Sequence, residues 1–112
     1  MPVRMDKPWL ALDASNVEQL TAHLGVYQLA NDAGTIVYIG VAGGRTLFGL
    51  KGELEKALSE RPVGATQFRF EANMAYRTRH TELLQTYLTD HGELPIGNTD
   101  VDIRRLGRIR PG

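Results

Sequence analysis

The sequence predicts an α/β domain of the α+β kind, in which a small, mostly antiparallel, three-stranded sheet is flanked by helices. Two runs of β-branched and aromatic residues, 26–30 and 35–39, are separated by the turn-forming tetrad Asn31-Asp32-Ala33-Gly34. A third run, residues 66–72, alternates apolar and polar side chains as a half-buried strand does. Apolar residues with helical spacing lie before, between and after these runs, which completes the α+β pattern.

The expected helices follow from apolar spacing and from residues that start or stop helices. Ser15-Asn16-Val17-Glu18 matches a capping box, so a short helix is expected from there to Gly25. Leucine and alanine spacing predicts a second helix at about residues 50–60, ending before Arg61-Pro62. The longest helix is expected over residues 74–91, with Gly92 as its stop. The predicted order is helix, strand, strand, helix, strand, helix.

Length and composition predict one folded domain. The chain has 112 residues, of which 42% are hydrophobic and 23% charged, as is usual for a globular domain. We expect an irregular lead-in over residues 1–13, the domain itself over residues 14–98 and a basic tail over residues 99–112.

Composition also excludes several classes of protein. The chain has no cysteine, which excludes a disulfide scaffold, a thiolate zinc site and a cysteine nucleophile. The two serines, Ser15 and Ser59, lie outside any Gly-x-Ser-x-Gly turn, and the three histidines lack metal-ligand spacing. The sequence has neither a long apolar run nor the apolar core of a signal peptide, so we expect no membrane partner and a cytoplasmic location.

Charge is balanced over the whole chain but not along it. There are 13 basic and 13 acidic residues, so the sequence carries no global signature of nucleic-acid binding. The basic residues gather in the tail, which contains Arg104, Arg105, Arg108 and Arg110. Any contact with phosphates must therefore be local.

Residues 40–49 form a glycine-rich stretch that falls short of the known phosphate-binding motifs. In a P-loop, lysine directly follows the last glycine, whereas here Leu50 separates Gly49 from Lys51. The glycine spacing also fails the dinucleotide fingerprint. We interpret the stretch as a tight turn between a strand and a helix.

Two tripeptides carry a family resemblance. Gly25-Val26-Tyr27 and Tyr38-Ile39-Gly40 resemble the signature of the GIY-YIG nuclease family, and Leu94-Pro95-Ile96-Gly97-Asn98 is similar to its terminal Pro-x-x-Asn. The resemblance covers about residues 24–98. It implies a small sheet with an active site on one face that hydrolyses phosphodiester bonds in DNA with the help of Mg²⁺ or Mn²⁺.

The resemblance also implies roles for individual residues. Tyr27 and Tyr38 would orient or deprotonate the attacking water, with Gly40 and Asn98 in support, and Glu82 would be the carboxylate ligand of the metal. The family has an arginine where this sequence has Phe48. Lys51 is the first candidate to supply that positive charge and Arg45 the second.

Contacts with nucleic acid are expected from Arg69, Arg104 and Arg105. A protein partner could supply specificity, since the chain contains no added DNA-recognition module. The alternative function is a catalytically inactive GIY-YIG-like module that binds nucleic acid or protein.

Each of these residues also has a purely structural interpretation. The tyrosines could be core aromatics of a sheet, and Glu82 could form a surface ion pair with Arg79 three positions earlier. Arg69 could pair with a carboxylate on a neighbouring strand.

Overall fold

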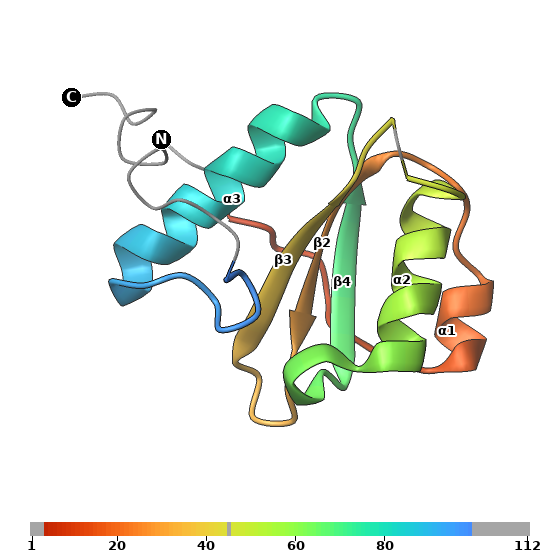
Figure 1. The fold of residues 1–112 in the computed structure, drawn as a ribbon, viewed down its shortest axis with the longest axis horizontal. Coiled ribbons are helices and arrows are strands. Elements are labelled where there is room, and N and C mark those ends of the chain that lie inside the picture. The colour runs from red at the N-terminus through yellow and green to blue at the C-terminus, as the bar shows by residue number, and fades with distance from the viewer. Residues whose placement is uncertain (1–3, 45, 100–112) are drawn as a thin grey trace.

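The structure, a computed structural model, describes residues 4–44 and 46–99 (Figure 1). Its elements are, in chain order, β1 (Leu10–Ala11), α1 (Ala14–Glu18), β2 (Gly25–Ala30), β3 (Ile36–Ala42), α2 (Gly49–Glu60), a short 3₁₀ turn (Pro62–Gly64), β4 (Gln67–Ala72) and α3 (Tyr76–His91). The strands form one antiparallel four-stranded sheet in the order β1-β4-β2-β3. The predicted α+β class is confirmed.

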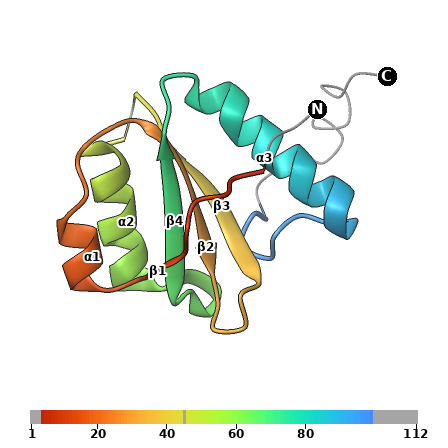
Figure 2. The same ribbon diagram turned by 180° about the vertical axis from the view of Figure 1, so that it is seen from behind.

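Helices cover both faces of the sheet. Figure 1 shows α1 and α2 on one side of the strands and α3 on the other, and Figure 2 shows the same layers from behind. The segment from Met5 to Leu12, which includes β1, connects the two sides: Met5 packs in the core beside α3, whereas Leu12 packs in the core beside α1 and α2. This segment passes the β4 edge of the sheet, where β1 pairs with β4.

The hairpin of β2 and β3 forms where the sequence predicts it. The Asn31 side-chain oxygen accepts hydrogen bonds from the backbone N–H groups of Ala33 and Thr35, both at 3.0 Å. Gly34 completes the turn with φ of +82°, a conformation that glycine adopts without steric cost. The turn chemistry therefore fixes the register of the two strands.

The lead-in is more ordered than the sequence predicts. Leu10 and Ala11 pair with Phe68 and Gln67 of β4, so the sheet has four strands where three were expected. A two-residue strand carries too little sequence to display an alternating pattern, and only its contact with β4 defines it.

The first helix is shorter than predicted and begins earlier. The α1 helix ends at Glu18, and its N-cap is Asp13, whose carboxylate accepts a hydrogen bond from the Asn16 N–H at 2.8 Å. The expected capping box headed by Ser15 is therefore wrong. Aspartate and serine are comparable N-cap residues, so local sequence does not choose between them.

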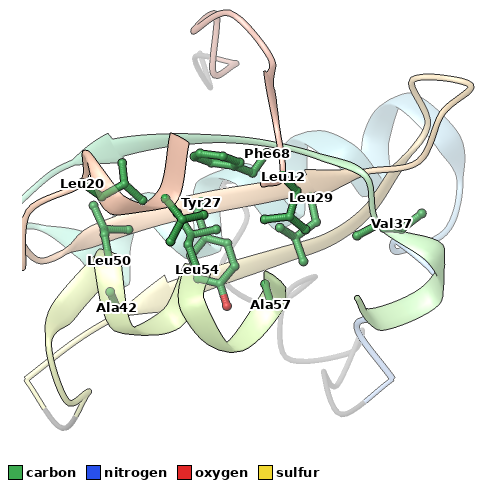
Figure 3. Close-up of a cluster of buried hydrophobic side chains, with 12 residues drawn as sticks. Leu12, Leu20, Tyr27, Leu29, Val37, Ala42, Leu50, Leu54, Ala57 and Phe68 are labelled. Carbon is green, nitrogen blue, oxygen red and sulfur yellow. The ribbon is translucent and has the colours of Figure 1, made fainter. Parts of the chain in front are cut away.

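Two hydrophobic cores lie on opposite faces of the sheet. In the larger core, drawn in Figure 3, side chains on one face of the sheet pack against α1 and α2. Leu54 and Phe68 are fully buried there. In the smaller core, Val26 and Ile39 pack against Leu83 and Leu84. Side chains of a strand alternate between faces, so neighbouring residues of β2 belong to different cores.

The start of α2 is anchored to the loop that precedes β2. The Leu50 N–H, one of the amides a helix leaves without an internal partner, donates to the His23 carbonyl at 2.8 Å. Gly49 has φ of +56° and lies so close to the Ala22 and His23 carbonyls that no Cβ would fit there. The glycine thus allows the close approach that orients α2 against the sheet.

Residues after α3 close the free edge of β3. The Asn98 side-chain oxygen accepts from the Ile39 N–H, and its side-chain NH₂ donates to the Ile39 carbonyl, both at 2.9 Å. The Gly97 N–H donates to the Val37 carbonyl at 2.7 Å. The buried Asn98 amide therefore takes the place of a further strand, and this contact is its role in the fold.

We predict that Asn98→Ala lowers the free energy of unfolding by about 1–3 kcal/mol, because the buried Ile39 N–H loses its partner. Urea unfolding followed by circular dichroism measures the change. The control is Ile96→Ala in the same turn, which is 67% exposed and should change stability by less than about 0.5 kcal/mol. Equal effects of the two substitutions would contradict the role given to Asn98.

Candidate functional site

A polar cavity of about 210 Å³ lies between α2 and the hairpin of β2 and β3. The strands contribute Tyr27, Leu29 and Tyr38, and the remaining lining residues are Glu53, Lys56, Ala57, Glu60, Pro62 and Gly97. It brings together two phenols, two carboxylates and an ammonium group. The structure therefore places both predicted tyrosines in one site.

Tyr27 is held between the sheet and α2. Its ring points from β2 toward the helix (Figure 3), it is 4% exposed, and its hydroxyl donates a hydrogen bond to Glu53 Oε1 at 3.0 Å. Gly40 lies opposite Tyr27 in the register, and a Cβ at Gly40 would overlap the Tyr27 ring. This packing is a physical reason for the glycine of the second tripeptide.

The environment keeps Tyr27 protonated. Burial raises the pKa of Tyr27 far above its usual value of 10.0, and the neighbouring Tyr38 and Glu53 raise it further. A phenol that stays protonated donates to the Glu53 carboxylate instead of accepting a proton from water. Tyr27 is therefore suited to hold Glu53 in position and not to act as a base, one of the two roles expected for it.

Tyr38 lies beside Tyr27 but is closer to solvent. Their ring centroids are 5.9 Å apart and the ring planes are inclined by 45°, an arrangement typical of packed aromatic pairs. Tyr38 is half-buried and lines the cavity, where Gly97 approaches its ring. Of the two tyrosines, Tyr38 is the one placed to meet a bound molecule.

One face of α2 supplies the charged groups. Glu53, Lys56 and Glu60 follow the helical spacing i, i+3, i+7, and all three line the cavity. The sequence analysis did not identify these three residues, although their helical spacing can be seen in the sequence. Lys51 was expected instead because it lies near Phe48. Lys51 precedes Glu53 by two positions, which places it on the other side of the helix, and it does not line the cavity.

Glu82 is not part of this site. It lies on α3, which packs through Leu83 and Leu84 on the face of the sheet opposite Tyr27. Glu82 forms an ion pair with Arg79, which also binds Glu71 at 2.9 Å. The structure therefore separates the expected metal ligand from the tyrosines and gives it the ion pair that its spacing from Arg79 allows.

Arg69 is also on the α3 side of the sheet. Its side chain donates to Gln28 at 2.6 Å and lies over the Trp9 ring, 4.3 Å from the ring centroid. Burial lowers the pKa of Arg69 from its usual value. The contact with Trp9 holds the N-terminal segment to the sheet. On the neighbouring strand, Arg69 pairs with the Gln28 amide, where a carboxylate was one expectation.

The remaining predicted residues fall into two groups. Gly40 and Asn98 support the site indirectly, through the Tyr27 ring and the edge of β3. Arg45, Arg104 and Arg105 lie outside the described residues.

The cavity offers a limited set of metal ligands. Among residues 4–44 and 46–99, no three His, Asp or Glu side chains are grouped so as to hold a metal ion. Mg²⁺, however, is often bound by one or two carboxylates with water completing the shell. Glu53 and Glu60 on one face of α2 are oxygen donors of that kind, so the donor chemistry fits Mg²⁺ or Mn²⁺.

The fold and the cavity define a small α+β domain with a polar site between an antiparallel sheet and the helix that covers it. The chain belongs to the family described as Domain of unknown function (DUF7508), whose family model matches residues 1–90. No curated protein and no solved structure gives a significant match. In the described part of the chain, none of the helices has the length and apolar character needed to span a membrane.

We predict that Tyr27 makes stability fall with rising pH above about 10. The native state keeps the Tyr27 proton while the unfolded chain releases it, so Tyr27 stabilises the fold fully below its unfolded pKa and less as the pH rises beyond it. In urea unfolding between pH 9 and 11, wild type should lose up to about 1.4 kcal/mol per pH unit more than Tyr27→Phe. Parallel curves for the two proteins would contradict the assignment.

We also predict that Gly40→Ala destabilises the protein by about 1–3 kcal/mol, because the new methyl group overlaps the Tyr27 ring. The matched control is Gly44→Ala, where the added Cβ would make only an ordinary contact with Tyr76. Thermal unfolding compares the two. An equal loss in both would mean that the Tyr27 packing is not the cause.

Proposed function

We propose that the chain is a GIY-YIG-like, metal-dependent endonuclease that hydrolyses phosphodiester bonds in DNA at the cavity between α2 and the hairpin. The observation that carries the proposal is the hydrogen bond from the Tyr27 hydroxyl to the Glu53 carboxylate, at the wall of a cavity that Tyr38 and Lys56 also line. A fixed carboxylate, a phenol and a cation are the groups that this chemistry uses.

The pairing of the two tripeptides supports the proposal. Residues 25–27 and 38–40 lie on adjacent antiparallel strands, and Tyr27 is directly opposite Gly40. The glycine gives the tyrosine ring the space it needs to reach α2. The similarity to the GIY-YIG signature therefore coincides with a packing interaction that builds the cavity.

Each polar residue of the cavity has a role in the proposal. Glu53, in place of Glu82, is the ligand of Mg²⁺ or Mn²⁺, an ion that would supply positive charge to the phosphate and acidify a water molecule when bound. Tyr27 holds the Glu53 carboxylate by its hydrogen bond. Tyr38 orients water through its hydroxyl, and the Lys56 ammonium stabilises negative charge on the phosphate.

The substrate and setting belong to the same proposal. Because the chain has no net charge, it contacts DNA only through local basic groups. A protein partner supplies the sequence or structure specificity. The location proposed for this activity is the cytoplasm.

We predict that the purified protein nicks supercoiled plasmid or cuts branched DNA with Mg²⁺ or Mn²⁺, and that Glu53→Gln lowers the rate by about 100-fold or more. Glu82→Gln is the matched control, because it makes the same change on the opposite side of the sheet and should leave the rate within a few-fold of wild type. Metal-dependent cutting that Glu82→Gln abolishes and Glu53→Gln leaves intact would overturn the site assignment.

Lys56→Met and Lys51→Met form a second pair of matched variants on α2. Each removes one positive charge, but only Lys56 lines the cavity. We predict that Lys56→Met slows cleavage by about 10-fold or more, whereas Lys51→Met does not, because phosphate stabilisation needs the charge within the site. Equal losses would point to a general effect of charge on DNA binding.

A second candidate function is a module that binds nucleic acid without cleaving it. The observation that favours it is the burial of Tyr27, which keeps the phenol protonated. Folded wild-type protein that fails to cut any substrate but binds DNA with a salt-dependent affinity would favour this candidate.

A further inference from the structure

A second polar cavity, of about 380 Å³, lies between the loop after β3 and the first turns of α3. Its lining residues are Val41, Gly43, Gly44, Thr46, Tyr76, Arg77, His80 and Thr81. It is on the α3 side of the sheet, whereas the candidate active site is on the α2 side. Residues of the glycine-rich stretch, Gly43, Gly44 and Thr46, thus border a cavity in addition to forming a turn.

The hydroxyl groups of Thr46 and Tyr76 accept hydrogen bonds from loop backbone N–H groups, and their own hydrogens remain free to be donated. The Gly44 N–H donates to the Tyr76 hydroxyl, and the Gly43 N–H donates to the Thr46 hydroxyl, both at 3.1 Å. Each oxygen therefore accepts a hydrogen bond and keeps its own O–H proton to donate. Within residues 4–44 and 46–99, neither of these O–H groups donates to another residue.

The charge of the lining has one sign. Among the described residues that line the cavity, Arg77 is positively charged and none is a carboxylate. None of the ion pairs in this part of the chain involves Arg77. His80 lies 3.1 Å from the Ile39 carbonyl through Nε2, and since a carbonyl only accepts, this nitrogen carries a hydrogen. That hydrogen is taken up by the Ile39 carbonyl, so the donors that the described lining residues offer are the hydroxyl groups and the Arg77 guanidinium.

Packing and hydrogen bonds within the loop shape this cavity. A Cβ at Gly43 would collide with the Tyr76 ring, so glycine is required for Tyr76 to pack against the loop. The Thr46 N–H closes the turn by donating to the Gly43 carbonyl at 3.0 Å. Such internal contacts restrict the residues that would bind, which lowers the entropy cost of binding.

We propose that this second cavity binds a phosphate group. Its oxygens would accept hydrogen bonds from the hydroxyls of Thr46, Tyr76 and Thr81 and a charge-assisted pair from the Arg77 guanidinium. The group could belong to a free phosphate compound or to a nucleic-acid backbone. The site is independent of the proposed nuclease chemistry, because it shares no residue with the first cavity.

The test is titration of the ¹⁵N-labelled full chain with inorganic phosphate and, separately, with a short single-stranded oligonucleotide, followed by amide chemical shifts. We expect saturable shifts at Gly43, Gly44 and the first turns of α3. Arg77→Met should weaken the affinity about tenfold, as expected for loss of a charge-assisted bond. Tyr76→Phe should weaken it less, and Lys51→Met, which removes the same charge elsewhere, should bind as wild type does.

The two probes distinguish the source of the phosphate. Saturable binding of inorganic phosphate alone supports a site for a small phosphate compound, and tighter binding of the oligonucleotide at the same amides supports a backbone contact. The proposal is overturned if neither probe shifts these amides, or if folded Arg77→Met binds as wild type does. Both outcomes can be reached whether or not the protein cleaves DNA.

Discussion

Burial of the central strand β2 is the constraint on which the rest of the structure depends. Every residue of Gly25–Ala30 is buried, with β4 and β3 bonded to its two edges and helices over its two faces. Val26 enters the core beside α3, and Tyr27 enters the core beside α2. A shift of one residue in the register would send each β2 side chain to the opposite core, so burial on both faces fixes the register of β2.

The candidate site is a consequence of this burial. Tyrosine brings a polar hydroxyl into an apolar layer, and such a group is costly unless it finds a partner. Gly40 gives the ring its space, and Glu53 gives the hydroxyl its acceptor. The hydrogen bond that orients the carboxylate of the site is thus the same bond that makes burial of Tyr27 acceptable.

The two cavities occupy opposite faces of the sheet and differ in chemistry. The first contains the carboxylates of Glu53 and Glu60 beside Lys56, so its lining carries charges of both signs. The second contains Arg77 and hydroxyl donors, and none of its described lining residues is a carboxylate. A chain with no net charge can therefore present two distinct local fields, because the sheet keeps the groups apart.

Local signals in the sequence determined the hairpin, the α2 and α3 helices and the strand at residues 67–72, because turn chemistry and apolar periodicity act over a few neighbouring residues. The resemblance of residues 25–27 and 38–40 to the GIY-YIG signature predicted that Tyr27 and Tyr38 share a site, and both line the same cavity. Tertiary packing decided the rest. Which face of the sheet or of a helix a residue occupies decides the pairing of β1 with β4. It also decides that Glu53 and Lys56, not Glu82 and Lys51, line the cavity beside Tyr27. A carboxylate on a helix meets a tyrosine of the sheet only when that helix covers the face into which the tyrosine points. Which helix covers which face is decided by the packing of the whole domain.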